Sequence, residues 1–456
     1  MELDMTKGSP VKLIFKFMLP LIVGNIFQQF YNMADTIIVG RAVGVQALAA
    51  VGATGTIMFL IIGFMQGLTT GFTVLTSQRF GAGDLDGLRK SVGNAAVLSI
   101  VVTVVMTVLS VAFMRPLLTL MKTPEDIFES AWQYITIICL GMGFTILYNL
   151  LSSILRAVGN SVVPLIFLVI SAVLNIALDL VFILGCHLGV AGAAIATITA
   201  QAVSGILCLF YIRKKVPLLK LSKTDWQLDY YCVRNELSIG VPMALQFSIT
   251  AVGTILVQVA LNILGSTVVA AYTAAGKVEQ LVTQPFVAMG MTMATYGGQN
   301  RGVNDLDRIR KGVKAANIIS AVYAIVIAFV IVNTFQYVIR LFVSGEEVGQ
   351  IMEYGKTYIL ICGSCFVPLG MIFIFRNILQ GCGFSFWPMM GGVVELVSRC
   401  VMAFAAAQYK SYVGVCAANA SAWLTAGIFL WIAYLFIMRK LLYRQQEQER
   451  KAAVSK

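Results

Sequence analysis

Long apolar stretches recur along almost the whole chain, and they constrain its fold more than any other feature. Twelve of them are long enough to cross the hydrocarbon core of a bilayer as helices. Composition agrees, because 59% of the 456 residues are hydrophobic and only 12% are charged. The sequence therefore predicts an all-α integral membrane protein. The twelve stretches lie near residues 13–39, 49–78, 92–114, 129–155, 163–184, 190–212, 236–263, 267–297, 313–339, 351–379, 386–408 and 413–438.

The chain also repeats itself. The pattern Q-x-x-G-x-x-D-L-D-x-x-R-K occurs at 78–90 and again at 299–311, and a second echo pairs 155–164 with 379–388. The spacing between the copies is 221 residues for the first pair and 224 for the second. Each half contains an even number of spans, so both halves enter the membrane in the same orientation. We expect two six-helix lobes related by a pseudo-two-fold axis along the membrane normal, with transport by alternating access.

One polar segment divides the spans six and six. Residues 213–235 hold most of the polarity in the middle of the sequence, and the connections elsewhere are short. This places an N-terminal lobe in 1–212, a cytoplasmic linker in 213–235 and a C-terminal lobe in 236–440. A cytoplasmic tail is predicted for 441–456.

The basic residues are distributed unevenly between the two sides of the predicted membrane. With a cytoplasmic N-terminus, the inside segments collect most of the Lys and Arg residues, including those of the linker and the tail. This asymmetry predicts a multi-pass protein of the cytoplasmic membrane, with both termini cytoplasmic. The outside receives only Arg41, Arg115, Lys122, Arg340 and Lys410.

Several function classes are disfavoured by composition. The net charge of +12 belongs to loops between apolar segments, and no separate basic domain suggests nucleic-acid binding. The nine Cys residues form no disulfide framework, and Cys362-Gly-Ser-Cys365 lacks a βαβ context for redox chemistry. The single histidine, His187, has no ligand partners nearby. We therefore expect a protein that is not an enzyme and has no cofactor.

The apolar stretch 163–184 contains two polar residues where lipid-facing side chains are expected. Asn175 and Asp179 are spaced i, i+4 and share one helix face. An ionisable residue inside a span usually faces the bundle interior or a watery cavity and marks an ion or substrate path. A structural hydrogen bond between helices is the alternative. A second acid that meets Asp179 would favour the functional interpretation.

Asp35 is that candidate second acid, and it lies one turn after Tyr31 in the first span. Two carboxylates in a low-dielectric pocket titrate as a coupled pair, which can hold a proton or a sodium ion. Asn175 and Thr197 offer neutral oxygens that suit a hard cation, and the same groups could instead hydrogen bond a protonated acid. The sequence does not choose between the two ions.

Other charges inside the spans have simpler interpretations. Glu395 and Arg399 are an i, i+4 pair, which predicts a self-neutralised structural ion pair. Lys277 and Glu279 are two residues apart and point to different faces, so they line the cavity or approach a loop.

Three glycines in the second span also suggest a packing feature. Gly63, Gly67 and Gly71 form two overlapping G-x-x-x-G spacings. Small residues at this spacing let helix backbones approach closely, so we expect a tight helix contact along this face.

Taken together, the two parallel halves, the doubled loop motif and Pro20 fifteen residues before Asp35 resemble the multidrug and toxic compound extrusion (MATE) transporters. The resemblance covers nearly the whole chain, and Pro242 repeats Pro20 in the second half. It implies a cation-coupled antiporter that exports small organic, often cationic, compounds. It also implies functional residues at matching positions: a cation site at Asp35, Asn175, Asp179 and Thr197, cavity aromatics at Tyr31 and Tyr134, and a bending helix at Pro20.

The chain departs from the family pattern in its second half. Some members carry acids in the seventh and tenth spans, where this chain has Gln246, Thr250 and Gln258 in the seventh and only Glu353 near an end of the tenth. A cation site in the C-terminal lobe is therefore not expected. In this lobe Gln258 and Glu279 are instead assigned to the substrate cavity.

Two rival functions remain open. A flippase of lipid-linked sugars or lipids shares the broader architecture but would favour several cavity arginines to hold a diphosphate. An intramembrane enzyme or a receptor would not explain the duplicated halves. The expected partners are small organic substrates and membrane lipids, the expected state is a monomer, and the cation site is a metal site only if sodium is the coupling ion.

Overall fold

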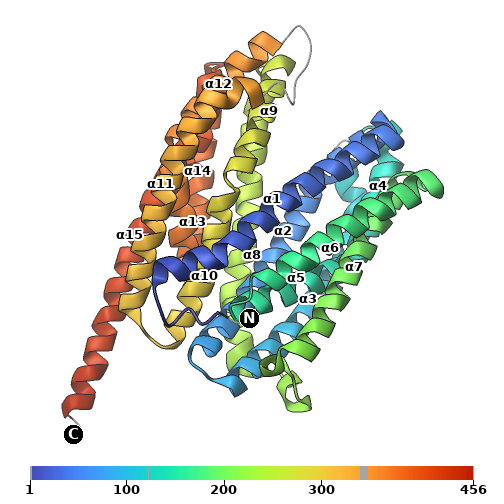
Figure 1. Ribbon diagram of the computed structural model, residues 1–456. Coiled ribbons are helices and arrows are strands. Elements are labelled where there is room, and N and C mark those ends of the chain that lie inside the picture. Colours follow the sequence, from blue (N-terminus) through green and yellow to red (C-terminus); the bar gives the residue numbers. More distant parts are fainter. Residues whose placement is uncertain (1–2, 122, 339–347, 455–456) are drawn as a thin grey trace. The chain divides into compact units, whose positions relative to one another are not determined.

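The computed structural model describes residues 3–121, 123–338 and 348–454 (Figure 1). Lys122 and Arg340, which were counted on the outside, lie beyond these ranges, as do the last two residues of the predicted tail. The described residues form helices and short turns and contain no strand. This confirms the all-α class that the apolar stretches predicted.

Nine helices of the described chain are long and apolar enough to cross a membrane, or eleven spans if each of two bent helix pairs is counted as one. Eleven of the twelve predicted stretches correspond to these spans. The remaining stretch, 267–297, is helical in α9 (Ser266–Val282) and α10 (Gln284–Gly302) but does not reach the same apolar length. The polar residues Lys277, Glu279 and Gln284 interrupt it.

Packing divides the chain into two compact units. Unit 1 comprises Met1–Asp4 and Leu19–Phe247, and unit 2 comprises Met5–Met18 and Ser248–Lys456. Because the boundaries after Met18 and after Phe247 fall within helices, α1 and α8 each contribute a part to both units. The lobe boundary that the sequence suggests, in 213–235, stays a prediction.

Unit 1 is built from helices that pack mostly on neighbours in the sequence. Helix α2 contacts α3, α4 and α5, and α7 contacts α4, α5 and α6 (Figure 1). Its elements are the larger part of α1 (Pro10–Ala42), then α2 (Val45–Gly81), α3 (Leu85–Leu120), α4 (Glu125–Leu140), α5 (Met142–Ala157), α6 (Val162–Asp179), the π-helix η1 (Leu180–Gly185), α7 (Gly189–Lys215), the 3₁₀ turns η2 (Pro217–Leu219) and η3 (Lys223–Trp226), and the start of α8 (Tyr230–Asn262).

Unit 2 has the corresponding elements. Helix α13 packs against α10, α11 and α15, and α14 packs along α15 (Figure 1). After α8, α9 and α10 its helices are α11 (Leu306–Val338), α12 (Val348–Ser364), α13 (Phe366–Gly381), α14 (Phe386–Gln408) and α15 (Tyr412–Val454).

The doubled loop motif folds in the same way in both copies. Asp84 caps the N-terminus of α3 and accepts a hydrogen bond from the Gly87 amide at 2.9 Å. Asp305 precedes α11 and accepts one from the Arg308 amide at 2.9 Å. A side-chain oxygen that accepts from an N-terminal amide satisfies a donor that has no partner within the helix. The repeated Asp therefore has a structural reason to occur at each helix start.

The two bent pairs occupy equivalent places in the repeat. Helices α4 and α5 meet at Gly141 with a bend of 48°, and α12 and α13 meet near Cys365 with a bend of 50°. A Cβ atom at Gly141 would lie 2.3 Å from the side chain of Ile198, which real contacts do not allow. Glycine is therefore required where α4 and α5 approach α7.

The glycines of α2 confirm the predicted close helix contact. A Cβ at Gly67 would lie 2.7 Å from the Cα of Ala244, and one at Gly71 would lie 2.4 Å from the Cα of Gly240. The backbones of α2 and the first part of α8 therefore touch over two turns. This is the packing that small residues at i, i+4 spacing permit.

Candidate functional site

The two acids that the sequence singled out meet inside unit 1. Asp35 lies on α1 and Asp179 is the last residue of α6, and their carboxyl groups form a hydrogen bond with each other. Asp179 is fully buried and Asp35 is partly buried. Two carboxyl groups can hydrogen bond only when one of them carries a proton, so this arrangement is chemically suited to holding a proton or another cation.

Asn175 and Thr197 complete the immediate surroundings of Asp179. The Asn175 amide lies 3.3 Å from the Thr197 hydroxyl. In the amide orientation that satisfies both of its ends, the nitrogen donates to Asp179 Oδ2 at 3.0 Å and the oxygen accepts from the Thr197 backbone N–H at 3.1 Å. Asn175 is 1% exposed, so its amide has no water to satisfy it and depends on these partners. The amide thus ties α6 to α7 beside the acid pair.

Two tyrosines lie on the same site. Tyr31, one turn before Asp35 on α1, lies close to the Thr197 side chain and within electrostatic range of both acids. Tyr134 of α4 is 5% exposed and lies within the same range of Asp35 and Asp179. Four helices of unit 1 therefore contribute to one buried polar site.

The backbone changes form at this site. Helix α6 ends at Asp179, and the chain continues as the six-residue π-helix Leu180–Gly185. Short π-helical segments are rare and occur frequently at functional sites, because the wider turn reorients the neighbouring side chains and carbonyls. The apolar sequence around Asp179 gives no sign of this change.

The site has unused acceptor capacity. Oδ1 of Asp35 and Oδ1 of Asp179 are buried without a donor from another residue. Buried polar atoms in proteins are normally satisfied, so carboxyl oxygens without a donor among the described residues are candidates for holding a proton, an ion or a water. Two carboxyl groups, an amide and hydroxyl oxygens form an all-oxygen set, which fits a proton or a hard cation.

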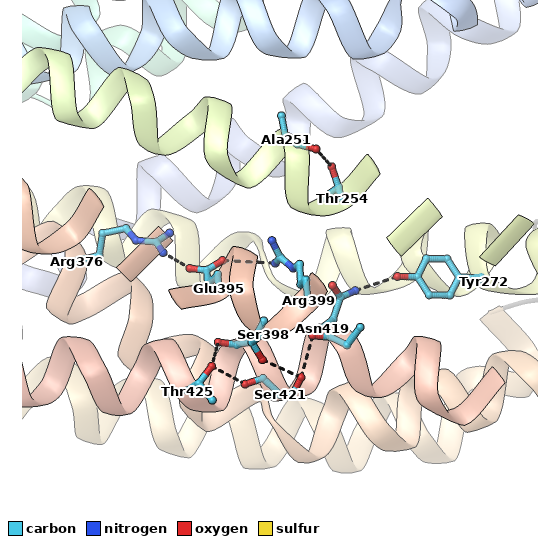
Figure 2. Close-up of polar contacts among 12 residues, drawn as sticks. Ala251, Thr254, Tyr272, Arg376, Glu395, Ser398, Arg399, Asn419, Ser421 and Thr425 are labelled. Carbon is cyan, nitrogen blue, oxygen red and sulfur yellow. Dashed lines mark hydrogen bonds and ion pairs between the residues drawn. The ribbon is translucent and has the colours of Figure 1, made fainter. Parts of the chain in front are cut away.

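Unit 2 holds a second buried polar cluster, with a different composition. Glu395 of α14 accepts a hydrogen bond from Arg376 of α13 and forms an ion pair with Arg399 at 3.4 Å, so it lies between two guanidinium groups (Figure 2). Glu395 is 4% exposed and Arg399 is 5% exposed. The predicted Glu395–Arg399 pair is present, but it is one part of a triad. Within the described part of the chain, three nitrogens have no hydrogen-bond partner: Arg399 Nε, Arg399 Nη1 and Arg376 Nε.

Two further hydrogen bonds, linked by a ring contact, lie in the same unit. Tyr358 of α12 donates to Glu279 of α9, and Tyr358 packs edge-on against Tyr272 with ring centroids 4.7 Å apart. Asn419 of α15 donates to the Tyr272 hydroxyl at 3.0 Å (Figure 2). Glu279 is also within electrostatic range of Arg399. Glu279 therefore belongs to the interior of unit 2.

The remaining predicted residues lie apart from these clusters. Gln258 is exposed on α8 and donates to Asn262 at 2.8 Å. Pro20 lies inside α1, close to the point where this helix passes from unit 2 to unit 1. Lys277 is exposed, whereas Glu279 is partly buried, which agrees with the prediction that the two point to different faces.

Sequence reasoning missed two buried charges. Arg376 is a lone basic residue in the apolar run of α13, and that isolation was the signal that could have identified it as a partner for a buried acid. Glu236 of α8 is 0% exposed, and neither of its carboxyl oxygens has a hydrogen-bond partner. It is the first residue of the predicted seventh span, directly after the predicted linker.

Comparison with known proteins places the chain in a family. The model of the MatE family matches residues 20–181 and 242–405, one match in each half of the repeat. YpnP of Bacillus subtilis, named a probable multidrug resistance protein, is 28% identical over 83% of this chain and 84% of its own. YoeA of the same organism, also named a probable multidrug resistance protein, is 27% identical over 95% of this chain and 96% of its own.

A solved structure shares the fold. The crystal structure of MATE in complex with MaL6 superposes with a TM-score of 0.91 at 22% identity, and it covers 96% of this chain and 99% of that one. The family and its named relatives are transporters, which confirms the expectation that the chain is not an enzyme. Because both family matches together span most of the sequence, the chain belongs to the MatE family of multidrug and toxic compound extrusion transporters.

Proposed function

We propose that this chain is a secondary antiporter that exports small organic, often cationic, compounds in exchange for protons or sodium. The observation that carries the proposal is the buried pair of Asp35 and Asp179, which share a hydrogen bond inside a membrane-spanning unit. A buried acid pair binds a cation reversibly, and coupled transport requires such a site.

The pair supplies the link between cation and substrate. An antiporter exchanges two ligands only if they favour different states or compete for the same charge. A coupling cation removes one negative charge from the pair of Asp35 and Asp179, and its release restores the charge that attracts a cationic compound. Tyr31 and Tyr134 beside the pair offer ring faces for such a compound. Gln258 and Glu279 in unit 2 stay predictions for substrate contact.

The surroundings of the pair are compatible with either ion. The Asn175 amide donates to Asp179 through its nitrogen, so it already supports a charged or hydrogen-bonded carboxylate. If sodium is the coupling ion, Asp35, Asn175, Asp179 and Thr197 are its ligands. For either ion, we place the protein in the cytoplasmic membrane with both termini cytoplasmic, because the charge asymmetry of the loops indicates this orientation. We propose that it acts as a monomer.

A flippase for lipid-linked saccharides is the second candidate. Two arginines of unit 2, the buried Arg399 and the partly buried Arg376, are the observation that favours it, since arginines bind diphosphates well. Glu395 lies between them and takes up part of their charge. We therefore rank export of organic compounds first.

Flux across proteoliposomes tests the proposal. A fluorescent cationic dye should move against an imposed proton or sodium gradient in the wild type. Asp35→Asn and Asp179→Asn should each reduce this flux to background, because Asn keeps the volume and hydrogen bonds of Asp but not the charge. Thermal unfolding of both variants serves as the folding control. Gradient-driven flux at the wild-type rate in either folded variant would refute the site, and movement of a lipid-linked saccharide without dye flux would select the flippase.

A further inference from the structure

An open apolar groove runs along unit 1, away from the acid pair. It has a volume of about 860 Å³ and lies between α3, α5 and α7, with the turns of the linker at one end. Its walls include side chains that are exposed rather than packed, among them Ile100 (58%), Val104 (57%) and Phe144 (43%). Exposed apolar walls on a membrane-spanning unit are where lipid chains lie.

The linker forms an ordered floor for this groove. Asn94, in the first part of α3, makes two hydrogen bonds to the linker. It accepts from the Asp229 amide at 2.9 Å and donates to the Gln227 carbonyl at 3.3 Å. A Cβ at Gly93 would lie 1.9 Å from the Asp225 carbonyl oxygen, so the linker backbone lies directly on the helix. The segment 216–229 is therefore held against α3.

Local contacts fix the turn that carries Trp226. The Ser222 amide and hydroxyl both donate to Asp225 Oδ2 at 2.7 Å. Burial favours a higher pKa for Asp225, but these hydrogen bonds, with Arg89 and Lys90 nearby, bring it below its ordinary value. The carboxylate thus stays charged and holds the turn in place, with Trp226 lining the groove.

Basic residues gather only at the linker end of the groove lining. Arg213, at the end of α7, and Lys220, in the linker, line it there, and both are exposed. Tryptophan is enriched at the boundary between the hydrocarbon and headgroup regions of a membrane, which places Trp226 at headgroup level. The groove is therefore apolar along its length and cationic at the end where a headgroup would lie.

The length of the groove matches one leaflet. Its lining runs along α3 from Val92 to Val104, a rise of about 18 Å at 1.5 Å per residue. Half of the hydrocarbon core of a bilayer is about 15 Å. An acyl chain that enters at Trp226 would therefore follow the groove to the membrane midplane.

We propose that this groove binds one anionic phospholipid from the leaflet next to the linker. The phosphate pairs with Arg213 and Lys220, and one acyl chain lies between α3 and α5. Basic pockets between membrane helices bind anionic headgroups in this way. The bound lipid would thus contact the linker as well as α3, α5 and α7 of the same unit.

Native mass spectrometry of the full chain in detergent tests this directly, with dioleoyl phosphatidylglycerol and dioleoyl phosphatidylcholine as probes. The wild type should retain phosphatidylglycerol preferentially. The double change Arg213→Gln with Lys220→Gln should weaken its binding about 25-fold, since each basic residue near a headgroup contributes about fivefold. Lys214→Gln with Lys215→Gln is the matched control, because it removes the same charge from exposed residues of the same helix end. This control should change binding much less.

A second variant tests whether an acyl chain occupies the groove. Gly143 lines the groove, and a Cβ there meets Thr103 at an ordinary 3.5 Å, so Gly143→Leu should fold and obstruct the chain. It should lower retention of both lipids, and unchanged unfolding temperatures of all variants in detergent would confirm intact folds. Equal binding of the two lipids, equal effects of the two double changes, unchanged binding in Gly143→Leu, or displacement by inorganic phosphate would each overturn the proposal.

Discussion

Two equivalent helices of the repeat, α6 in unit 1 and α14 in unit 2, carry buried charge of opposite character. On α6, Asp179 is fully buried and contacts a second acid, Asp35. On α14, Glu395 is just as deeply buried but lies between two arginines. A duplicated scaffold has therefore kept its helices and bends while the charge in its two interiors has diverged.

The difference lies in what each acid can still bind. Glu395 is neutralised by partners of its own unit, whereas the oxygens of Asp35 and Asp179 include two without a donor from any other residue. A neutralised charge has little left to gain from a cation, and an unsatisfied pair has much to gain. Cation-dependent behaviour should therefore arise in unit 1, while the cluster of unit 2 should mainly stabilise its fold.

The largest expected effect on stability comes from Arg376, which makes the closer contact with Glu395. Removing one partner of a buried ion pair leaves an uncompensated charge and typically costs about 3–5 kcal/mol. Arg376→Met should therefore strongly reduce the folded yield and the unfolding temperature of purified protein. Arg399→Met should cost less, because the contact between Arg376 and Glu395 remains. An Arg399→Met variant that is less stable than Arg376→Met would contradict this ranking.

A double change serves as the control for that ranking. Arg376→Met together with Glu395→Gln leaves the buried Arg399 without its acid, so it should not recover the stability lost in Arg376→Met alone. The sequence alone predicted such a recovery for Glu395→Ala with Arg399→Ala. The triad changes this expectation, since that pair of changes leaves Arg376 without its acid.

Asn175 should have the next largest effect, and in unit 1 this effect is on transport. Asn175→Leu removes the amide that donates to Asp179 at 3.0 Å. A hydrogen bond to a charged group contributes about 1.5–3 kcal/mol, so the cation concentration for half-maximal flux should rise about 10- to 100-fold. The measurement is dye flux against graded proton and sodium gradients. A purely structural Asn175 would instead lower the amount of folded protein and leave the half-maximal concentration unchanged.

Thr197 should show the smallest effect of the three. Thr197→Val removes one hydroxyl that hydrogen bonds the Asn175 amide at 3.3 Å and keeps the backbone N–H that donates to Asn175. A neutral hydrogen bond contributes about 1 kcal/mol, so the same half-maximal concentration should change about fivefold. A Thr197→Val variant that loses all gradient-driven flux would assign the hydroxyl a larger role than this account allows.

Much of the fold and of the unit 1 site followed from the sequence. Apolar length predicted the spans, and the spacing of Asn175 and Asp179 indicated a polar helix face. Proximity of Asp35 to Asp179 was an inference from two buried acids that each lacked a partner within its own helix. The family resemblance added Thr197, Tyr31 and Tyr134, which the structure places around the pair.

Other features depend on contacts that periodicity does not encode. Arg376 reaches Glu395 across the turn between α13 and α14, and neither helix pattern reveals which neighbour a buried charge faces. The π-helix after Asp179 leaves no mark in an apolar run. Residues 213–235 look like a polar linker, yet Gly93 and Asn94 hold part of this segment against α3. Each of these features is fixed by a partner distant in sequence.

The most direct test of the central claim is binding of a fluorescent cationic dye to the purified chain across pH, with and without sodium. If protons couple transport, the dye should bind more tightly as pH rises and sodium should have little effect. If sodium couples transport, sodium should weaken dye binding at fixed pH. In either case Asp35→Asn should abolish the dependence, while Glu279→Gln in unit 2 should keep it. A folded Asp35→Asn variant with the pH and sodium dependence of the wild type would contradict the account.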